Sequence, residues 1–229
     1  FAVVFAKEVF GGTGYNVFNV ALITRAFLFF SYPSRMTGDS IWVARESIFG
    51  LGYTLPDGFT MATPLGQIGQ GVTINASLQD MITGLIPGSV GETSVIAIAI
   101  GAVILLWTDI ASWKTMLSVF LGGTVMGLVF QSSGATPIPW YEHLVLGGFC
   151  FGAVFMATDP VTSARTETGK WIYGFFVGVM CVFIRVLNPG YPEGMMLAIL
   201  LMNVFAPLID YFVVNANIQR RARRLKKAN

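Results

Sequence analysis

The sequence predicts an all-α fold, a polytopic transmembrane helical bundle with broken or re-entrant segments. Hydrophobic residues make up 54% of the chain and charged residues only 11%, whereas soluble domains carry about 25% charged residues. The mean hydropathy is +0.68, and apolar runs of near-spanning length alternate with polar loops. These observations exclude an ordinary soluble domain, so we expect a single transmembrane domain over residues 1–229.

Five apolar runs define the expected spans, at residues 94–108, 113–130, 143–157, 171–187 and 194–214. Polar segments rich in Pro and Gly separate several of them, because these residues end helices. The N-terminal third is less regular. Residues 15–32 are apolar but contain Asn16, Asn19 and Arg25, a pattern typical of a span or of a broken helix lined by protein. Residues 33–93 have mixed composition and predict an extramembrane segment, with a short helix around 78–85.

The charge distribution sets the expected orientation. Six of the 14 basic residues lie in the last ten positions, directly after an apolar run. This favours a basic cytoplasmic tail over residues 215–229 rather than a nucleic-acid-binding segment. Counting spans backwards from the tail places the 33–93 segment on the outer, periplasmic side. The chain starts at Phe1 inside an apolar run, without an initiator Met, so we expect an N-terminal part of the full subunit to be missing.

Residues 57–63 (DGFTMAT) hold the sharpest chemical signal. They resemble the recognition motif of flavin transferases, Asp-x-x-Ser/Thr-Gly-Ala-Thr, whose last threonine receives FMN through a phosphoester. Asp57, Thr60, Ala62 and Thr63 fit this motif, and Met61 replaces the usual glycine. A hydroxyl is a weak nucleophile without a base or metal, so a separate transferase must reach it. The alternative is a threonine-rich turn stopped by the following proline.

A second threonine competes for the flavin. Residues 133–136 (SGAT) copy the second half of the motif more closely, but Phe130 stands where the motif has its aspartate. The expected topology places Thr136 on the outer side as well. Asp57 therefore distinguishes the two, and Thr63 is the predicted attachment site.

Several longer stretches carry a family resemblance. They are KEVFGGTG at 7–14, RAFLFF at 25–30, HLVLGG at 143–148, MATDPV at 156–161 and YPEGMMLAIL at 191–200. Together they look like the FMN-carrying membrane subunit of the Na⁺-translocating NADH:quinone oxidoreductase. The homologous RnfD-type subunit of the Rnf ferredoxin:NAD oxidoreductase shares some of these elements, but the KEVFGGTG and MATDPV strings favour the first assignment. The insertion at residues 43–56 has no counterpart in the resemblance.

The resemblance implies a redox-driven sodium pump of the bacterial inner membrane. Electrons would pass from NADH through covalent FMN and non-covalent riboflavin to ubiquinone, coupled to Na⁺ export. The implied partners are the other subunits of the complex (A, C, D, E and F), with no nucleic acid. Cys150 and Cys181 lack the spacing of metal ligands, so iron–sulfur centres would belong to partners. The alternative class is a non-redox secondary transporter or channel, which would carry no covalent flavin.

Two aspartates near apolar runs are candidates for the ion path, Asp159 and Asp210. A charge at the edge of a membrane span is costly and suggests function, and Na⁺ as a hard cation prefers oxygen ligands. Both match family aspartates implicated in sodium handling. The alternatives are a turn or helix cap for Asp159, which precedes Pro160, and an interfacial pair with the Arg220 region for Asp210.

Further candidates are weaker. Glu8 lies beside Gly11 and Gly12, and glycines permit close backbone approach, so these residues predict a quinone or flavin pocket. Arg25 and Arg185 lie in apolar runs, where each is expected to pair with a carboxylate, a carbonyl or a cofactor phosphate. His143 is the only histidine. We expect it to cap or pack rather than to bind a ligand.

Overall fold

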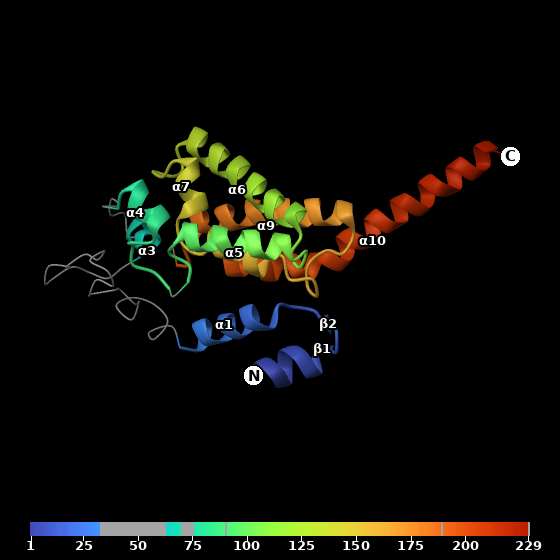
Figure 1. Cartoon of the computed structure of the whole chain (residues 1–229), viewed down its shortest axis with the longest axis horizontal. Coiled ribbons are helices and arrows are strands. Elements are labelled where there is room, and N and C mark those ends of the chain that lie inside the picture. Colours follow the sequence, from blue (N-terminus) through green and yellow to red (C-terminus); the bar gives the residue numbers. More distant parts are fainter. Residues whose placement is uncertain (33–62, 70–75, 90, 189, 229) are drawn as a thin grey trace, which may run out of the picture.

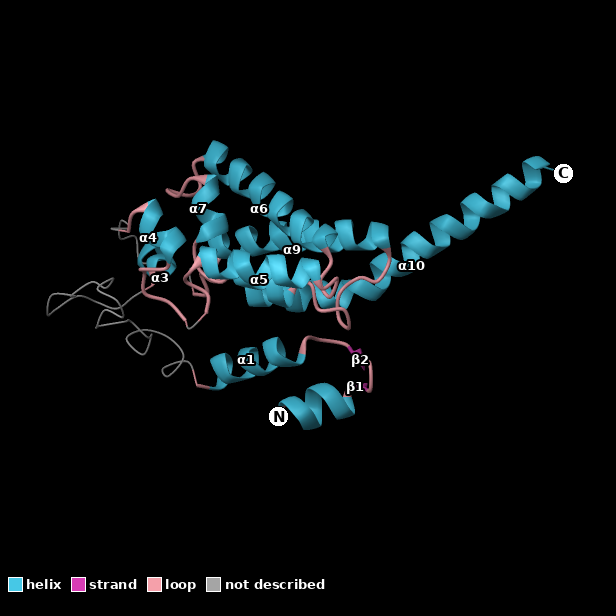
Figure 2. Ribbon diagram, viewed as in Figure 1, coloured by secondary structure: helices cyan, strands magenta, loops and turns pink. Residues whose placement is uncertain are grey.

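The computed structural model describes residues 1–32, 63–69, 76–89, 91–188 and 190–228 of the chain. Within them the fold is almost entirely helical, with one two-stranded hairpin (Figures 1 and 2). The elements in chain order are the π-helix η1 (Ala2–Val9), β1 (Gly11–Gly12), β2 (Tyr15–Asn16), α1 (Val20–Ser31), α3 (Pro64–Gly69), α4 (Leu78–Thr83), α5 (Val95–Trp107), α6 (Trp113–Ser133), α7 (Trp140–Val145), α8 (Phe149–Phe151), the π-helix η4 (Gly152–Met156), α9 (Glu167–Leu187) and α10 (Met195–Ala228). The predicted fold class is confirmed.

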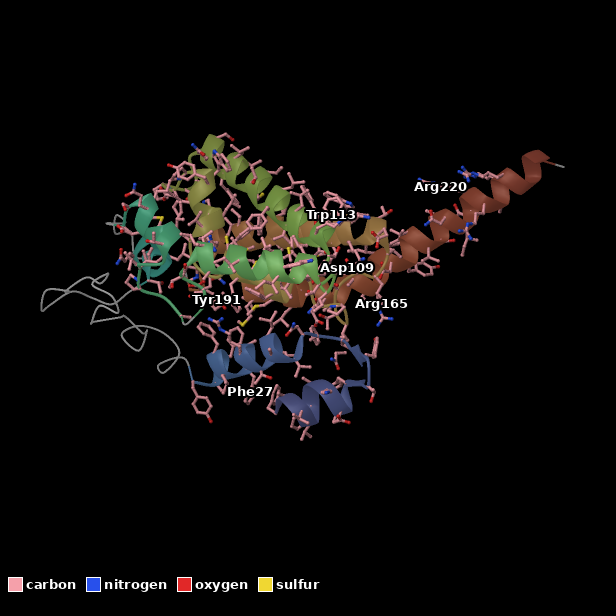
Figure 3. The ribbon with its side chains drawn as sticks, in the orientation of Figure 1. Phe27, Asp109, Trp113, Arg165, Tyr191 and Arg220 are labelled. Carbon is pink, nitrogen blue, oxygen red and sulfur yellow. The ribbon has the colours of Figure 1, made fainter. Side chains whose placement is uncertain are left out.

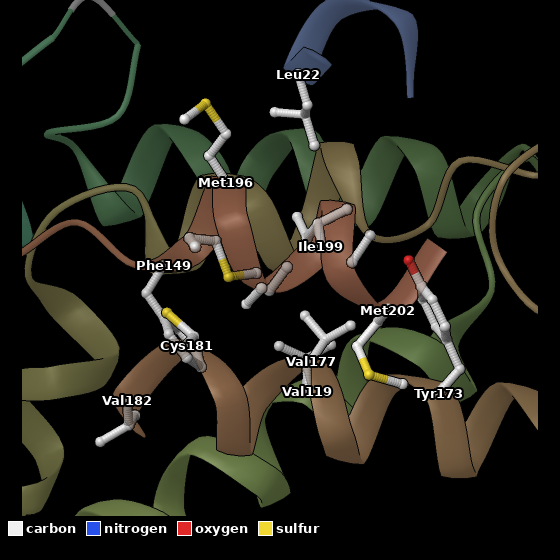
Figure 4. Packing of buried hydrophobic residues seen from close by; sticks show 14 of the residues in the cluster. Leu22, Val119, Phe149, Tyr173, Val177, Cys181, Val182, Met196, Ile199 and Met202 are labelled. Carbon is white, nitrogen blue, oxygen red and sulfur yellow. The ribbon is translucent and has the colours of Figure 1, made fainter. Parts of the chain in front are cut away.

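The helices α6, α9 and α10 form the centre of the bundle. Glycines let α6 and α9 approach backbone to backbone: a Cβ added at Gly122 would lie 2.0 Å from Phe175 O, and one added at Gly178 would lie 2.1 Å from Val119 O. Such close packing is common between membrane helices because no hydrophobic force drives them together in lipid. Figure 4 shows Leu22 of α1 extending toward Ile199 of α10, so the N-terminal segment joins the same core.

Three helices in the described part of the chain are long and apolar enough to cross a membrane, namely α6, α9 and residues 195–224 of α10. At most 39% of the apolar window of each is buried inside the chain, which leaves apolar faces that the described part of the chain does not cover. The expected span at 94–108 is α5, which has 13 residues and reaches about 20 Å at 1.5 Å per residue, short of a hydrocarbon core of about 30 Å.

The prediction of one continuous span at 143–157 is wrong. It consists of α7, α8 and η4, with a break after α7 at Leu146–Gly148. Leu146 is extended at ψ 142° and Gly147 has φ +61°, a left-handed conformation that favours glycine. A side chain at Gly147 would also collide with Leu65 and Glu193. The break therefore reflects a specific turn that packs against α3 and the loop before α10.

Other helix ends differ from the expected ones by a few residues. α9 begins at Glu167 rather than at 171, because Thr166 caps it by accepting the Gly169 N–H at 3.1 Å. α10 continues through the basic tail to Ala228. The short helix expected around 78–85 is α4, and Ser77 and Asp80 form a capping box at its start.

Residues 1–32 form a helix, a hairpin and a second helix. η1 leads into the β1–β2 hairpin, in which Gly11 pairs with Asn16 and Gly12 with Tyr15. Asn19 then caps α1 by accepting the N–H groups of Ala21 and Leu22. The apolar stretch at 15–32 is thus a broken segment with a 12-residue helix, in line with the broken-helix alternative.

The bundle has two distinct ends, visible in Figure 3. Tyr191 lies toward the end that carries α3, α4 and α7, whereas Asp109 and Arg165 lie toward the opposite end, near the β1–β2 hairpin. The part of α10 that carries Arg220 extends away from the bundle beyond this second end. Residues that start α3 are therefore separated from the basic tail by the length of the bundle.

Candidate functional site

Thr63 begins α3 at one end of the bundle. Its Oγ1 accepts the Gly66 N–H at 3.1 Å and its carbonyl accepts the Gln67 N–H at 2.9 Å, so the threonine caps the helix. Leu65 anchors the helix in a small core with Met81, Ile138 and Leu146. The Thr63 side chain is half-buried, held at a helix start rather than in the bundle core. The other motif residues, Asp57, Thr60 and Ala62, and the insertion at 43–56 lie outside the described residues.

The carboxylates of Glu92 and Glu193 lie close to each other beside Thr63. Thr63, Glu92 and Glu193 line a cavity of about 10 Å³, and the Gly148 N–H donates to Glu193 Oε2 at 3.2 Å. Burial, and next the charge of Glu92, raise the pKa of the Glu193 carboxyl above its usual value. The space on this side of Thr63 is too small for a phosphate, and two glutamates are among the residues that line it.

Arg185 joins three segments near this end. Its guanidinium donates to His143 O at 2.6 Å, to Leu146 O at 3.2 Å and to Glu193 O at 3.4 Å. These carbonyls belong to α7, to the break after it and to the loop before α10, so one buried cation satisfies backbone groups that the break leaves without helical partners. Arg185 was expected to pair with a carboxylate, a carbonyl or a cofactor phosphate, and the structure shows it bound to carbonyls.

The opposite end holds Asp159 in a hydrogen-bonded turn. Its Oδ1 accepts the Val161 N–H at 3.1 Å, and its Oδ2 accepts from Thr162 Oγ1 at 2.8 Å and from Asn19 Nδ2 at 3.3 Å. A cavity of about 420 Å³ is lined by Asp159 together with Asn16, Asn19 and Thr158. Asn16 Oδ1 is buried and has no hydrogen-bond partner within the described part of the chain. Asp159 therefore takes the turn role and also lines this cavity.

Asp210 binds the start of α9 instead of the tail. Its carboxylate accepts from Arg165 N at 2.8 Å, from Thr166 N at 3.0 Å and from Thr166 Oγ1 at 2.6 Å. The alternative of a pairing with the Arg220 region is wrong, because the carboxylate accepts from the loop before α9. In the described ranges, no group of three or more His, Cys, Asp or Glu residues comes together as a metal site.

Asp210→Ala is expected to lower the stability of the assembled protein by roughly 3 kcal/mol, because three donors lose a charged acceptor. If Asp210 acts only as this clamp, the loss is the same with and without Na⁺. If it binds the ion, Na⁺ stabilises the wild type but not the variant. Thermal unfolding of the purified complex at zero and high Na⁺ separates these outcomes. Asp109→Asn serves as control, because it removes an exposed carboxylate and asparagine tolerates the positive φ of 55° at this position.

Comparisons with known proteins show the family of this chain. The profile of the NQR2, RnfD, RnfE family matches residues 1–219. The chain belongs to this family. Similar relatives are the Na(+)-translocating NADH-quinone reductase subunits B of Chromohalobacter salexigens, Pseudomonas paraeruginosa and Klebsiella pneumoniae, at 53%, 51% and 50% identity over 98% of this chain. The matches cover 54–55% of those proteins, so the chain spans about half the length of the relatives.

In this member of the NQR2, RnfD, RnfE family, the backbone requires a glycine at one position of the cluster near Glu8, namely Gly11. A Cβ at Gly11 would lie 2.6 Å from Asn16 Oδ1 and 2.7 Å from Lys7 O, so the hairpin requires glycine there. A Cβ at Gly12 meets nothing within 4 Å, and the Glu8 side chain is exposed. Gly12 and Glu8 thus face open space at the Asp159 end, and their role as a quinone or flavin pocket stays a prediction.

Sequence reasoning missed the groups that surround Thr63. Glu92 and Glu193 lie far from Thr63 along the chain, and only the fold brings them to its side. Glu193 is part of the YPEG string that supported the family resemblance, which was the one available signal. Arg25 lines a further cavity of about 20 Å³ with both glutamates. His143 is fully buried, in line with the packing role that the sequence favours, and it lies beside a cavity next to α3.

Proposed function

We propose that this chain is part of the membrane subunit of a redox-driven sodium pump in the bacterial inner membrane. In this proposal electrons pass from NADH, through FMN on Thr63 and a non-covalent riboflavin, to ubiquinone, and Na⁺ is exported. The observation that carries the proposal is the separation of two sites: the hydroxyl of Thr63 lies at one end of the bundle, and the Asp159 cavity lies at the other. Names of the relatives support the assignment.

The residues at the first end fit a covalent FMN. Thr63 offers a half-buried hydroxyl whose oxygen accepts one N–H, at a helix start that a transferase can reach from outside the bundle core. When bound, FMN supplies a one-electron carrier. This chain's own contribution is to hold the ester at α3 and to keep the ring near the packed end of the bundle. The flanking motif residues Asp57, Thr60 and Ala62 would be read by the transferase.

At the second end we propose the Na⁺ entry. The Asp159 carboxylate is an oxygen ligand of the kind that hard cations take, and Asp159 lines one cavity of the described part of the chain together with Asn16 and Asn19. Asp210 stays a candidate, although its bonds to the start of α9 favour a clamp. The basic α10 tail lies at this same end, which supports a cytoplasmic side for Na⁺ uptake and a periplasmic side for Thr63.

The outward apolar faces support membership of a larger assembly. Large exposed apolar side chains line α5, α6 and α10, among them Ile100, Val103, Leu121 and Phe205. Such faces need lipid or other membrane subunits to cover them. The other subunits of the quinone reductase (A, C, D, E and F) are the proposed partners, and riboflavin and ubiquinone the further redox groups.

Sodium uptake by inverted membrane vesicles tests the proposed function. Vesicles that contain the full-length subunit in its complex are expected to take up radioactive Na⁺ on addition of NADH, and a protonophore should not stop the uptake. Vesicles without the complex are the control. Uptake abolished by the protonophore would indicate proton pumping, and uptake independent of NADH would indicate the non-redox transporter class. Either result would contradict the proposal.

A further inference from the structure

Two buried polar side chains meet where α9 and α10 pack together. Asn203 of α10 is 1% exposed and Tyr173 of α9 is 0% exposed, and both belong to helices that are long and apolar enough to cross a membrane. Tyr173 Oη lies 2.8 Å from the Asn203 amide, and Figure 4 shows the Tyr173 hydroxyl turned toward α10. A polar side chain within a spanning helix is costly and is therefore a functional candidate.

The Asn203 amide also holds the residue that precedes α1. With its oxygen toward Asn19, the amide accepts the Asn19 backbone N–H at 3.1 Å, and its nitrogen donates to Ile199 O at 3.2 Å and to Tyr173 Oη at 2.8 Å. The opposite orientation would set the amide nitrogen against the Asn19 N–H and the amide oxygen against a carbonyl, so the neighbouring groups select the first orientation. Asn203 therefore fixes the backbone of Asn19 from α10.

Asn19 joins α10 to the Asp159 turn. Its Oδ1 accepts the N–H groups of Ala21 and Leu22 at the start of α1, and its Nδ2 donates to Asp159 Oδ2 at 3.3 Å. Because the amide group is planar, the bonds to Oδ1 also set the direction of Nδ2. The Asn19 side chain is thus fixed on α1 and points its donor at Asp159, and its backbone is fixed on Asn203.

Helix α10 also holds the far end of the loop that Asp159 begins. This loop runs from η4 to α9, and Asp210 of α10 accepts the N–H groups of Arg165 and Thr166 where the loop ends. Asn203 and Asp210 are about two helical turns apart, so they lie on the same side of α10. One face of α10 therefore fastens the loop at both ends, directly through Asp210 and indirectly through Asn203.

We propose that Asn203 is a positioning residue for the Na⁺ entry, which through Asn19 holds the Asp159 carboxylate at the cavity that Asp159 lines. This inference rests on the proposed role of Asp159 in Na⁺ uptake. Groups that bind a ligand residue without touching the ion tune the affinity of the site, because they fix the orientation of that residue. Without the Asn203 amide, the Asn19 N–H loses its acceptor on α10, the start of α1 is free to shift, and Asp159 loses a fixed donor.

The test is NADH-driven Na⁺ uptake by inverted vesicles that contain the full-length subunit in its complex, measured over a range of Na⁺ concentrations. Asn203→Leu keeps a side chain of similar size without the amide, and it is expected to raise the Na⁺ concentration for half-maximal uptake about tenfold. The rate at saturating Na⁺ should change little, because the variant weakens binding rather than electron transfer. A merely structural role would lower that rate and leave the half-saturating concentration unchanged.

Thr115→Val is the matched control. Thr115 is a buried polar residue of α6, at 1% exposure, and its Oγ1 has no hydrogen-bond partner in the described part of the chain. The variant removes a buried hydroxyl from a spanning helix outside the Asn203 network, so the half-saturating Na⁺ concentration should stay at the wild-type value. An equal rise in Thr115→Val overturns the inference. So does an Asn203→Leu complex that is slower at saturating Na⁺ but has the wild-type half-saturating concentration.

A second variant decides the question if Asn203→Leu fails to assemble. Tyr173→Phe removes only the hydroxyl that contacts the Asn203 amide, and it should raise the half-saturating Na⁺ concentration by a smaller factor. A wild-type Na⁺ dependence in Tyr173→Phe contradicts the inference while leaving the proposed function intact. Wild-type vesicles that show no NADH-driven uptake at any Na⁺ concentration overturn the proposed function, and the inference with it.

Discussion

Replacing Thr63 with valine in the full-length subunit is expected to abolish covalent flavin completely. Valine has nearly the shape of threonine but no hydroxyl, so no phosphoester can form. The measurement is ultraviolet fluorescence of the subunit band on a denaturing gel, where only covalent flavin remains. The wild type should fluoresce and the variant should be dark.

Two further variants make this result specific. Thr63→Asn keeps a good helix cap for α3 but has no hydroxyl, so it should be dark as well, which excludes loss of the cap as the cause. Thr136→Val should stay fluorescent. Its hydroxyl accepts the Ile138 N–H at 3.2 Å within the loop between α6 and α7, where no motif aspartate precedes it. A fluorescent Thr63→Val band would refute the site.

Arg185→Leu is expected to cost about 3–5 kcal/mol of stability, because the carbonyls of His143 and Leu146 lose a charged donor inside the bundle. The complex should therefore fail to assemble or should unfold well below the wild-type temperature in detergent. Arg185→Lys has a single ammonium group that cannot span the same fork of carbonyls, and its loss should be intermediate. Thermal unfolding of the purified complex gives the comparison.

The control for this series is Arg165→Ala. The Arg165 side chain is exposed, and only its backbone N–H binds Asp210. Its removal should change stability by less than about 0.5 kcal/mol. An Arg185→Leu complex as stable as Arg165→Ala would mean that the break after α7 is held by other contacts.

The sequence predicted the helical class and most helix positions, because long apolar runs between Pro- and Gly-bearing loops have few alternatives in a membrane. The run at 143–157 failed as a continuous span. Nothing in its hydropathy marks the break, which depends on the left-handed turn at Gly147 and on long-range bonds from Arg185. The ends of α9 and α10 were also missed, since they depend on the Thr166 cap and on a helical basic tail.

The candidate site was predictable only in part. The family strings and the flavin motif led to Thr63 directly, because both are local in sequence. Glu92 and His143 come from segments far from α3, and only the packing of α3 against the break after α7 makes them neighbours. Asp159 and Asp210 were both predicted as ion ligands, but their hydrogen bonds, which sequence cannot supply, distinguish a cavity-facing turn from a helix clamp.

Mass spectrometry of the peptide that contains Thr63 tests the central claim most directly. The subunit is purified, denatured and digested, and the peptide around residues 57–64 is fragmented to locate any added mass. The account predicts the mass of FMN, less one water, on Thr63. An unmodified Thr63 peptide in a complex that still contains flavin would contradict it.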